Sequence, residues 1–283
     1  MRILFFLLFP LFSYSQLTIG ILESSRAKFL LDDYPTNGAA FALRKISFTY
    51  TGNCIRVRRS SDNTEQDIGF LNNVLDTAAM KTFVGANNGF VVTWYDQSGA
   101  AKNAGQSTAA NQPSIITSGV INYNSSNKPT IKFDGSNDAL TLTAIAMSNY
   151  SFFIYYGSTT GAVGEAIASD DGTSNFFIQR GGSNSFQDVP IGFTGSNTFN
   201  TSGRLVSTHK TSGVTGGIIA FNGVSQSITF FTAVYTNFQR IGQRAIGSLT
   251  ITGNISEFVF YTTNQSSNRI AIETNINSFY QIY

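Results

Sequence analysis

The chain of 283 residues is poor in the side chains that most often carry metal, redox and nucleophilic chemistry. It has one cysteine, Cys54, and one histidine, His209, together with one tryptophan and five prolines. This scarcity excludes Cys/His zinc clusters, sites built from two histidines and Cys–His nucleophilic pairs within one chain. A single cysteine also forms no internal disulfide, so a large packed core has to supply the stability.

Charge is scarce as well. Charged residues make up 12% of the sequence, and 18 basic against 16 acidic residues leave a net charge of +2. Such a balance lacks the basic stripe of a nucleic-acid-binding protein, so no nucleic-acid partner is predicted. The abundant residues are 25 Phe, 12 Tyr and 26 Gly. This composition is typical of a β-rich globular protein that works by surface recognition or by carboxylate chemistry.

The first residues have the layout of a secretory signal peptide. Arg2 precedes an apolar run from Ile3 to Phe12, and small or polar residues follow. We expect residues 1–15 to be the signal peptide, with cleavage near Ser15 or Gln16. The run is too short to span a bilayer, and no later stretch approaches eighteen apolar residues. The prediction is a secreted or cell-surface protein without a membrane span after cleavage; the alternative is a retained anchor or a buried first strand.

Short apolar runs separated by Gly, Ser, Asn and Asp clusters predict many strands. They fall at residues 54–59, 90–95, 130–133, 150–156, 175–179, 204–209, 217–221, 227–231 and 254–261. Many short strands with few helices indicate an all-β fold, a jelly-roll β-sandwich with short peripheral helices and a C-terminal helix. Since no linker or repeat divides the chain, residues 16–283 are expected to form one domain.

Three segments have helical character. Residues 37–46 are expected to make one or two turns. Asp76 is the predicted N-cap of a helix over residues 77–84, which Gly85 can end. Apolar side chains at i, i+4, i+7 and i+8 predict a closing helix within residues 266–280, capped by Ser266 or Ser267.

Several motifs occur in a familiar order. They read AFALRKIS at 40–47, IRVRRSSDN at 55–63, QDIGF at 66–70, WYDQSG at 94–99, NQPSII at 111–116 and KPTIKFDGSNDAL at 128–140. This set resembles the catalytic domain of α-L-arabinofuranosidase B and the exported bacterial and phage proteins that share its N-terminal half. Residues 253–283 resemble the end of a concanavalin A-like (laminin G-type) jelly roll.

The resemblance implies a β-sandwich that removes terminal α-L-arabinofuranosyl groups from plant or algal polysaccharide with retention of configuration. Retention requires a carboxylate nucleophile and a carboxylic acid about 5 Å apart. The family's nucleophile is the Glu of a Met-Glu-Asn-Asn run, and this sequence contains no Glu-Asn-Asn. Gln243 or Arg244 stands where the family has its acid, and Cys54 cannot replace the adjacent cysteine pair of the family's sugar floor. We therefore expect the catalytic pair to be lost.

If another acid/base pair exists, the candidates are Glu257 with Asp171 or Asp188. Glu257 interrupts an apolar strand, where burial could raise its pKa. The alternative is that Glu257 faces solvent at a strand edge or pairs with an arginine such as Arg240.

The candidate ligand-binding residues are Trp94, Tyr95, Asp96 and Gln97, which end a strand and begin a turn. Aromatic rings offer apolar faces to sugar C–H groups, and the polar pair could bind hydroxyls. The alternative is that Asp96 caps the turn while the aromatic rings fill the core.

Two further clusters have two interpretations each, and the single histidine has one. Arg56, Arg58 and Arg59 could bind a polyanion, but nearby acidic residues favour an internal ion-pair network. Oxygen-rich loops, chiefly Asp134 to Asp138, are turns that could also hold calcium, the one cofactor considered. His209 is expected to be a satisfied histidine within the sheet.

Three functions follow from these observations. The first is a lectin-like protein that binds polysaccharide or cell-surface glycan on an arabinofuranosidase scaffold. The second is an active arabinofuranosidase or related glycoside hydrolase with relocated carboxylates. The third is a structural or adhesive protein of a cell envelope or virion, without a sugar site.

Overall fold

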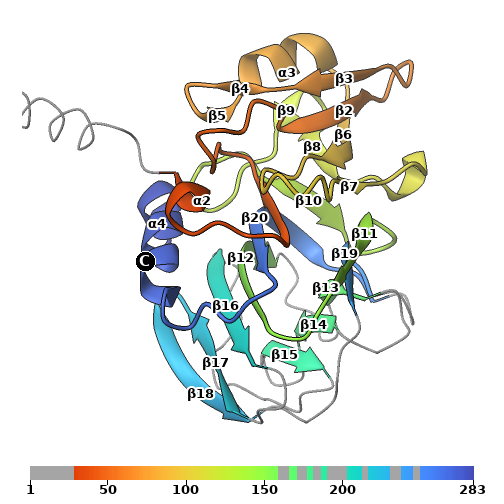
Figure 1. The fold of residues 1–283 in the computed structure, drawn as a ribbon. Helices are drawn as coiled ribbons and strands as arrows, with labels where there is room; N and C mark the ends of the chain where they lie inside the picture. Colours follow the sequence, from red (N-terminus) through yellow and green to blue (C-terminus); the bar gives the residue numbers. More distant parts are fainter. Residues whose placement is uncertain are drawn as a thin grey trace, which may run out of the picture.

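The computed structural model describes residues 29–158, 166–170, 177–180, 186–189, 203–211, 216–229, 237–244 and 249–283. Within these ranges the chain is built mainly of antiparallel strands. Figure 1 shows them as two stacked layers with short helices at the periphery. None of the described helices is long and apolar enough to cross a membrane.

The strands are β1 (Ala39–Ala42), β2 (Ile55–Arg59), β3 (Glu65–Ile68), β4 (Phe70–Leu71), β5 (Val74–Leu75), β6 (Gly89–Trp94), β7 (Ala104–Gly105), β8 (Ser114–Thr117), β9 (Val120–Ile121), β10 (Ile131–Asp134), β11 (Leu140–Ala146), β12 (Tyr150–Ser158), β13 (Ala166–Ser169), β14 (Phe177–Arg180), β15 (Phe186–Val189), β16 (Arg204–Lys210), β17 (Gly216–Phe221), β18 (Val224–Thr229), β19 (Asn237–Ile241) and β20 (Thr252–Tyr261). The helices are α2 (Leu30–Asp33), the 3₁₀ turn η1 (Ala109–Asn111), α3 (Thr77–Val84) and α4 (Arg269–Tyr280).

Strand β20 organises the first layer. It pairs with β12 along one edge and with β1 and β10 along the other, and β12 continues the layer through β16, β17 and β18. The second layer runs from β2 through β6, β7, β11 and β19 to β13. Strand β8 pairs with both β6 and β10, so the two layers form one continuous network.

Aromatic side chains fill the space between the layers. Phe238 of β19 stacks on Phe258 and Phe260 of β20, with ring centroids 5.1 and 5.0 Å apart. Phe41 of β1 lies 5.6 Å from Trp94 of β6. All five side chains are buried. The abundance of Phe in the sequence is therefore explained in part by a core formed between two sheets, where large rings bury much apolar area.

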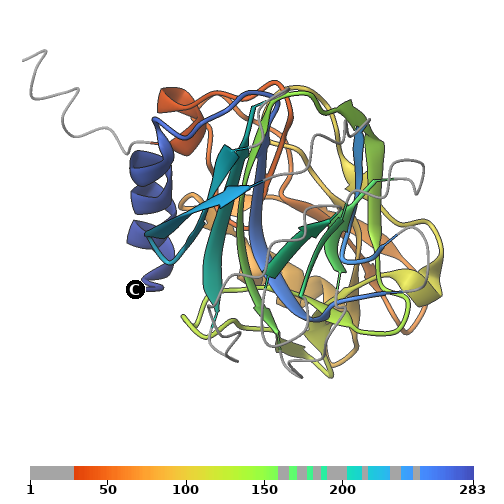
Figure 2. The ribbon, with the colours of Figure 1, turned by 90° about the horizontal axis from the view of Figure 1, so that it is seen from below.

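A second, smaller core lies on the outer side of the first layer. Helix α4 covers this face beside α2, as Figures 1 and 2 show. Its apolar stripe, Ile272, Ile276 and Tyr280, packs against residues of β12, β16 and β20. The change from period 2 to the helical period at the end of the sequence thus produces a helix with one buried face.

The expected all-β sandwich with peripheral helices is confirmed, and so are most strand positions. Helix α3 is capped as predicted, because the Asp76 carboxylate accepts a hydrogen bond from the Ala79 amide at 2.9 Å and Gly85 has a positive φ of 63°. The predicted strand at 175–179 begins outside the described residues, and that at 227–231 ends outside them. The jelly-roll assignment and the single domain stay predictions.

Two local predictions are wrong. Residues 39–42 form strand β1, not a helix, because pairing with Glu257–Phe260 of β20 outweighs the weak local preference of Ala-rich sequence. Helix α4 begins at Arg269 after Asn268, and no side chain caps it, so neither Ser266 nor Ser267 has the expected role. Residues 1–28 lie outside the described residues, so the signal peptide stays a prediction.

Candidate functional site

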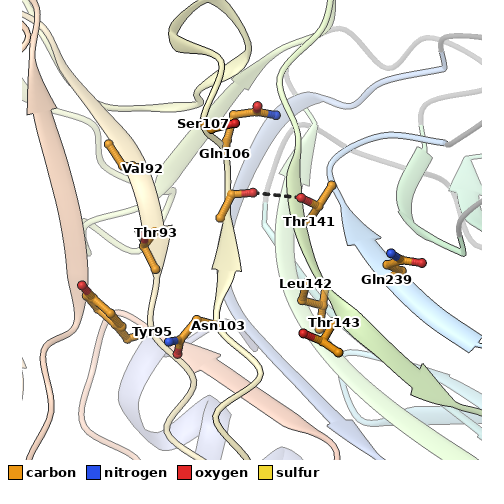
Figure 3. A pocket seen from close by; sticks show the side chains of 11 residues that line it. Val92, Thr93, Tyr95, Asn103, Gln106, Ser107, Thr141, Leu142, Thr143 and Gln239 are labelled. Atoms are coloured by element: carbon orange, nitrogen blue, oxygen red, sulfur yellow. Dashed lines mark hydrogen bonds between the residues drawn. The ribbon is translucent and has the colours of Figure 1, made fainter.

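An open groove of about 610 Å³ lies on the solvent-facing side of the second layer (Figure 3). Its lining comes from β6, β7, β11, β19 and the turns beside them: Val92, Thr93, Tyr95, Asn103, Gly105, Gln106, Ser107, Thr141, Leu142, Thr143 and Gln239. This volume is in the range that holds a drug-sized molecule.

The groove follows from strand periodicity and from one glycine. Side chains alternate along a strand, so Thr93 and Tyr95 face outward while Trp94 between them faces the core. In register, Gly105 lies opposite Thr93 on one side and Thr141 on the other. A β-carbon at Gly105 would meet no atom closer than 3.5 Å. The missing side chain therefore leaves a hollow between Thr93 on one side and Thr141 on the other.

Several polar groups of the lining are available to a ligand. The hydroxyls of Thr93, Ser107 and Thr143 and the amide of Gln239 make no hydrogen bond to other described residues. Others hold the groove together. Thr141 donates to the Gly105 carbonyl at 3.1 Å, as Figure 3 shows, and Gln106 donates to the Ala139 carbonyl at 3.0 Å.

Tyr95 is fixed at one side of the groove. Its hydroxyl donates to Asp67 Oδ1 at 2.7 Å, and Arg56 binds both oxygens of Asp67 at 2.8 Å. Burial and the hydrogen bond to Asp67 raise the pKa of Tyr95 to about 12. The hydrogen bond from Arg56 lowers the pKa of Asp67. The phenol therefore stays protonated and oriented, and its oxygen keeps lone pairs that can accept a hydrogen bond from a ligand.

The other three residues of the predicted ligand-binding run have structural roles. Trp94 is fully buried. Asp96 accepts hydrogen bonds from the amides of Ala40, Ser98 and Lys102 at 2.8–2.9 Å, as a turn cap does. Gln97 donates to the carbonyls of Ala42 and Arg44 at 3.0 Å and accepts from Ile46. The contacts of Trp94 and Asp96 thus match the alternative interpretation, in which Asp96 caps the turn and the tryptophan ring fills the core. Of residues 94–97, only Tyr95 lines the groove.

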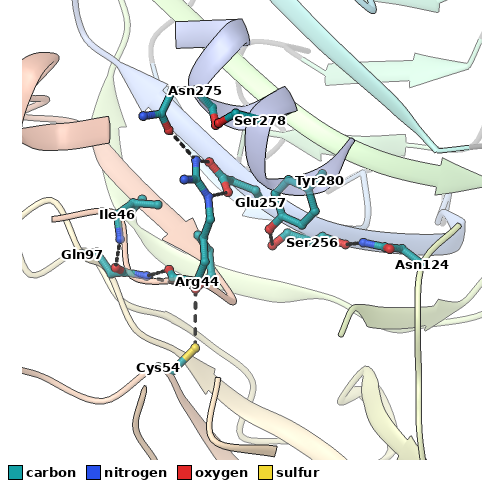
Figure 4. Close-up of polar contacts among 11 residues, drawn as sticks. Arg44, Ile46, Cys54, Gln97, Asn124, Ser256, Glu257, Asn275, Ser278 and Tyr280 are labelled. Atoms are coloured by element: carbon teal, nitrogen blue, oxygen red, sulfur yellow. Dashed lines mark hydrogen bonds and ion pairs between the residues drawn. The ribbon is translucent and has the colours of Figure 1, made fainter. Parts of the chain in front are cut away.

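Glu257 neither faces solvent nor pairs with Arg240. It is fully buried, and Arg44 binds its two oxygens at 2.7 and 2.9 Å (Figure 4). Asn275 of α4 accepts a further hydrogen bond from Arg44 at 2.9 Å. The prediction of solvent exposure is wrong, whereas pairing with an arginine is confirmed, with Arg44 in place of Arg240. Arg44 is the partner because the register of β1 against β20 brings the end of one strand beside the middle of the other.

Sequence reasoning missed Arg44. Its only signal was a charge in the otherwise apolar run AFAL-R at 40–44. Of the residues proposed as partners of Glu257, Asp171 lies outside the described residues. Asp188 lies in β15 opposite Ile178, and its side chain is not described. The pairing of Glu257 with either residue therefore stays a prediction.

The Asp134–Asp138 loop is a closed turn. Asp138 accepts from the Asp134 amide at 2.9 Å, and Asp134 accepts from the Ser136 amide at 2.8 Å. Burial, with the neighbouring Asp134 charge, raises the pKa of Asp138 to about 6. Within the described part of the chain no three His, Cys, Asp or Glu side chains gather as a metal site would require. Calcium at this loop stays a prediction.

The arginines of β2 and the single histidine make contacts within the protein. Arg56 pairs with Asp67 and Arg59 with Asp62, so the expected internal ion pairs are confirmed for these two arginines. Arg58 instead donates to the side-chain oxygens of Gln112 and Asn63. His209 is fully buried, 2.9 Å from the Ser151 hydroxyl and 3.2 Å from that of Ser207. Burial, with the nearby charge of Arg269, lowers the pKa of His209 to about 3. The prediction of a satisfied histidine in the sheet is confirmed.

The architecture is that of a known class of glycoside hydrolases. The chain is similar in structure to an arabinofuranosidase complexed with arabinofuranosyl-α-1,2-xylobiose (TM-score 0.69, 15% identity) and to a GH54 α-L-arabinofuranosidase soaked with a cyclic sulfate inhibitor (TM-score 0.68, 15% identity). Each likeness covers 89% of this chain and 64% of the other. The fold is thus the β-sandwich of the GH54 arabinofuranosidases, and the chain spans about 64% of their length.

The sequence agrees with this fold over its N-terminal part. Residues 32–167 match the family described as "Alpha-L-arabinofuranosidase B, catalytic". No curated protein matches the chain. The matched segment contains Tyr95, Gly105 and Thr141 of the groove, and it ends before Gln243 and Arg244.

Proposed function

We propose that this protein is a lectin-like relative of the arabinofuranosidases and binds carbohydrate in the groove over β6, β7, β11 and β19. The observation that carries the proposal is the lining itself. It combines a fixed tyrosine with hydroxyl and amide groups that have no partner among the described residues, and its described residues include no carboxylate. Such a set can hydrogen-bond sugar hydroxyls but cannot supply an acid and a nucleophile.

Loss of the catalytic pair is part of the proposal. The resemblance places the family's acid at Gln243 or Arg244, and neither an amide nor a guanidinium donates a proton as an acid near neutral pH. Glu257 does not substitute for it, since its carboxylate is buried and held by Arg44. These two observations support binding without hydrolysis.

The direct test is isothermal titration calorimetry with plant and algal polysaccharides chosen from a glycan array. We expect binding that Tyr95→Ala weakens at least tenfold, because the variant removes the ring and its hydroxyl from the groove. Tyr123→Ala is the matched control, since Tyr123 is an exposed tyrosine outside the groove. Absence of binding to every glycan would overturn the proposal and leave the structural or adhesive role.

An active glycoside hydrolase is the second candidate. The family match over residues 32–167 and the GH54-type fold favour it. The test is release of nitrophenol from 4-nitrophenyl α-L-arabinofuranoside, and we expect none. Activity that Asp171→Asn or Asp188→Asn abolishes would establish hydrolysis, whereas Glu257→Gln is not informative because Glu257 stabilises the fold.

Export belongs to the same proposal, since a glycan-binding protein has to meet its ligand. Arg2 and the apolar run after it support cleavage of residues 1–15. N-terminal sequencing of the protein recovered from the medium should start near Gln16. A chain that keeps residue 1 and stays inside the cell would contradict export.

A further inference from the structure

The groove is elongated across the sheet. Thr93, Gly105 and Thr141 are directly opposite one another on β6, β7 and β11, and β11 pairs in turn with β19, which supplies Gln239. Neighbouring strands are about 4.8 Å apart, so three such steps span roughly 14 Å. This length is greater than one sugar ring needs.

The groove is also open along its rim. Asn103, Ser107, Thr141 and Thr143 line it and are all exposed, so these side chains do not enclose a ligand. A socket for a terminal sugar has to enclose that sugar on several sides. An open trough instead lets a chain enter and leave at its ends.

The lining residues that the structure describes carry no formal charge. They include no Asp, Glu, Lys or Arg, and the partly exposed ion pair of Arg56 with Asp67, to which Tyr95 donates, lies outside this set. Arg240 lies opposite Thr141 in register, but its guanidinium donates to Gln243 at 3.0 Å. None of the described lining residues therefore offers the bidentate charge pairing that a uronate or sulfate group would favour.

We propose that the groove binds an internal stretch of a neutral polysaccharide, several sugar rings long, and that Gly105 is the residue that makes room for it. This inference rests on the proposed carbohydrate binding and specifies its ligand. Terminal-sugar recognition is the alternative against which it is tested.

The test is calorimetry with arabino- and xylo-oligosaccharides of one to six units. We expect affinity to rise at least tenfold from one to three units and then to level off. A hexamer blocked at both ends should bind within twofold of the free hexamer, and oligogalacturonate should bind at least tenfold more weakly. A monosaccharide as tight as the hexamer, loss of binding on blocking the ends, or equal binding of oligogalacturonate would overturn the inference.

Variants at Gly105 separate the inference from the function on which it rests. Gly105→Ala should leave oligosaccharide binding unchanged, and Gly105→Leu should abolish it because the larger side chain fills the groove. Gly216→Leu is the matched control, because Gly216 is also in a strand with open space at its β-carbon. Circular dichroism and the urea midpoint establish that the variants fold. If the groove binds only oligosaccharides with a free chain end, the inference is wrong but the proposed carbohydrate binding stands. If no carbohydrate binds at all, the inference and the proposed function are both wrong.

A folded Gly105→Leu variant that binds oligosaccharides as tightly as wild type would also overturn the inference, because the ligand would then lie elsewhere. Tyr95→Ala distinguishes this case. If Tyr95→Ala also leaves oligosaccharide binding unchanged, the groove is not the carbohydrate-binding site. The proposal that carbohydrate binds in this groove is then wrong.

Discussion

Arg44 and Glu257 form a buried bidentate ion pair that joins β20 to the chain just after β1. Arg44 also donates to Asn275 of α4, and its guanidinium lies 5.3 Å from the centre of the Phe279 ring. The pair therefore fixes the last helix against the first layer. Because both charges are desolvated, each depends on the other to remain in the interior.

Removing one partner of this pair should be strongly destabilising. Glu257→Gln leaves Arg44 as an uncompensated buried charge, and we expect a loss of about 3–5 kcal/mol in the free energy of unfolding. Urea denaturation followed by circular dichroism measures it. The double variant Arg44→Met with Glu257→Leu should regain much of the loss, because no charge is then left unpaired.

The exposed pair Arg59–Asp62 provides the control. Asp62→Asn removes a partner in the same way but at the surface, where water replaces it. Its urea midpoint should stay at the wild-type value. Equal midpoints for Glu257→Gln and wild type would show that burial of this pair contributes nothing to stability.

Stability should depend on pH through the single histidine. The folded-state pKa of His209, about 3, is below its ordinary value of 6.5, so the unfolded chain binds a proton that the folded chain does not. The stabilisation is fully present above about pH 6.5 and decreases as the pH falls toward 3. Between pH 6 and 5 the titration of His209 by itself lowers the free energy of unfolding by roughly 1 kcal/mol per pH unit, while Asp138, whose folded pKa of about 6 lies above its ordinary value of 3.8, contributes with the opposite sign.

His209→Gln should remove the His209 contribution, so that the slope in the variant differs from that in wild type, since an amide can still contact Ser151 and Ser207 but does not titrate. The free energy of unfolding from urea titrations at pH 5.0, 5.5, 6.0 and 6.5 makes the comparison. The same slope in the variant and in wild type would assign the titration to carboxylates instead.

Tyr95→Phe separates the ring of Tyr95 from its hydroxyl. The variant keeps the apolar face and loses one hydrogen-bonding group, which is worth about 0.5–1.5 kcal/mol. We expect glycan affinity to fall about two- to tenfold, less than for Tyr95→Ala, as measured by calorimetry. If Tyr95→Phe bound as tightly as wild type, the orientation of the phenol by Asp67 would have no role in recognition.

Helix α3 should depend on its N-cap. Asp76→Ala removes the hydrogen bond to the Ala79 amide and should lower the free energy of unfolding by about 0.5–2 kcal/mol. Ser267→Ala is the control, because no side chain caps α4. A larger effect at Ser267 than at Asp76 would contradict the capping contacts of both helices.

Local chemistry in the sequence was enough to predict the fold class and several details. The spacing of Ile272, Ile276 and Tyr280 predicted the buried face of α4. Asp76 and Gly85 mark the ends of α3 because capping depends only on neighbouring backbone groups. Composition alone restricted the available chemistry, since Cys54 and His209 are each the single residue of their kind.

The tertiary structure determined which strands pair and which residues lie opposite one another across them. Residues 39–42 became a strand only because β20 is there to pair with them, and the same register brings Arg44 to Glu257 across more than two hundred residues. The groove likewise depends on Gly105 lying between Thr93 and Thr141, three positions on separate strands. No local pattern encodes such pairings, because strand register depends on contacts between distant segments of the chain.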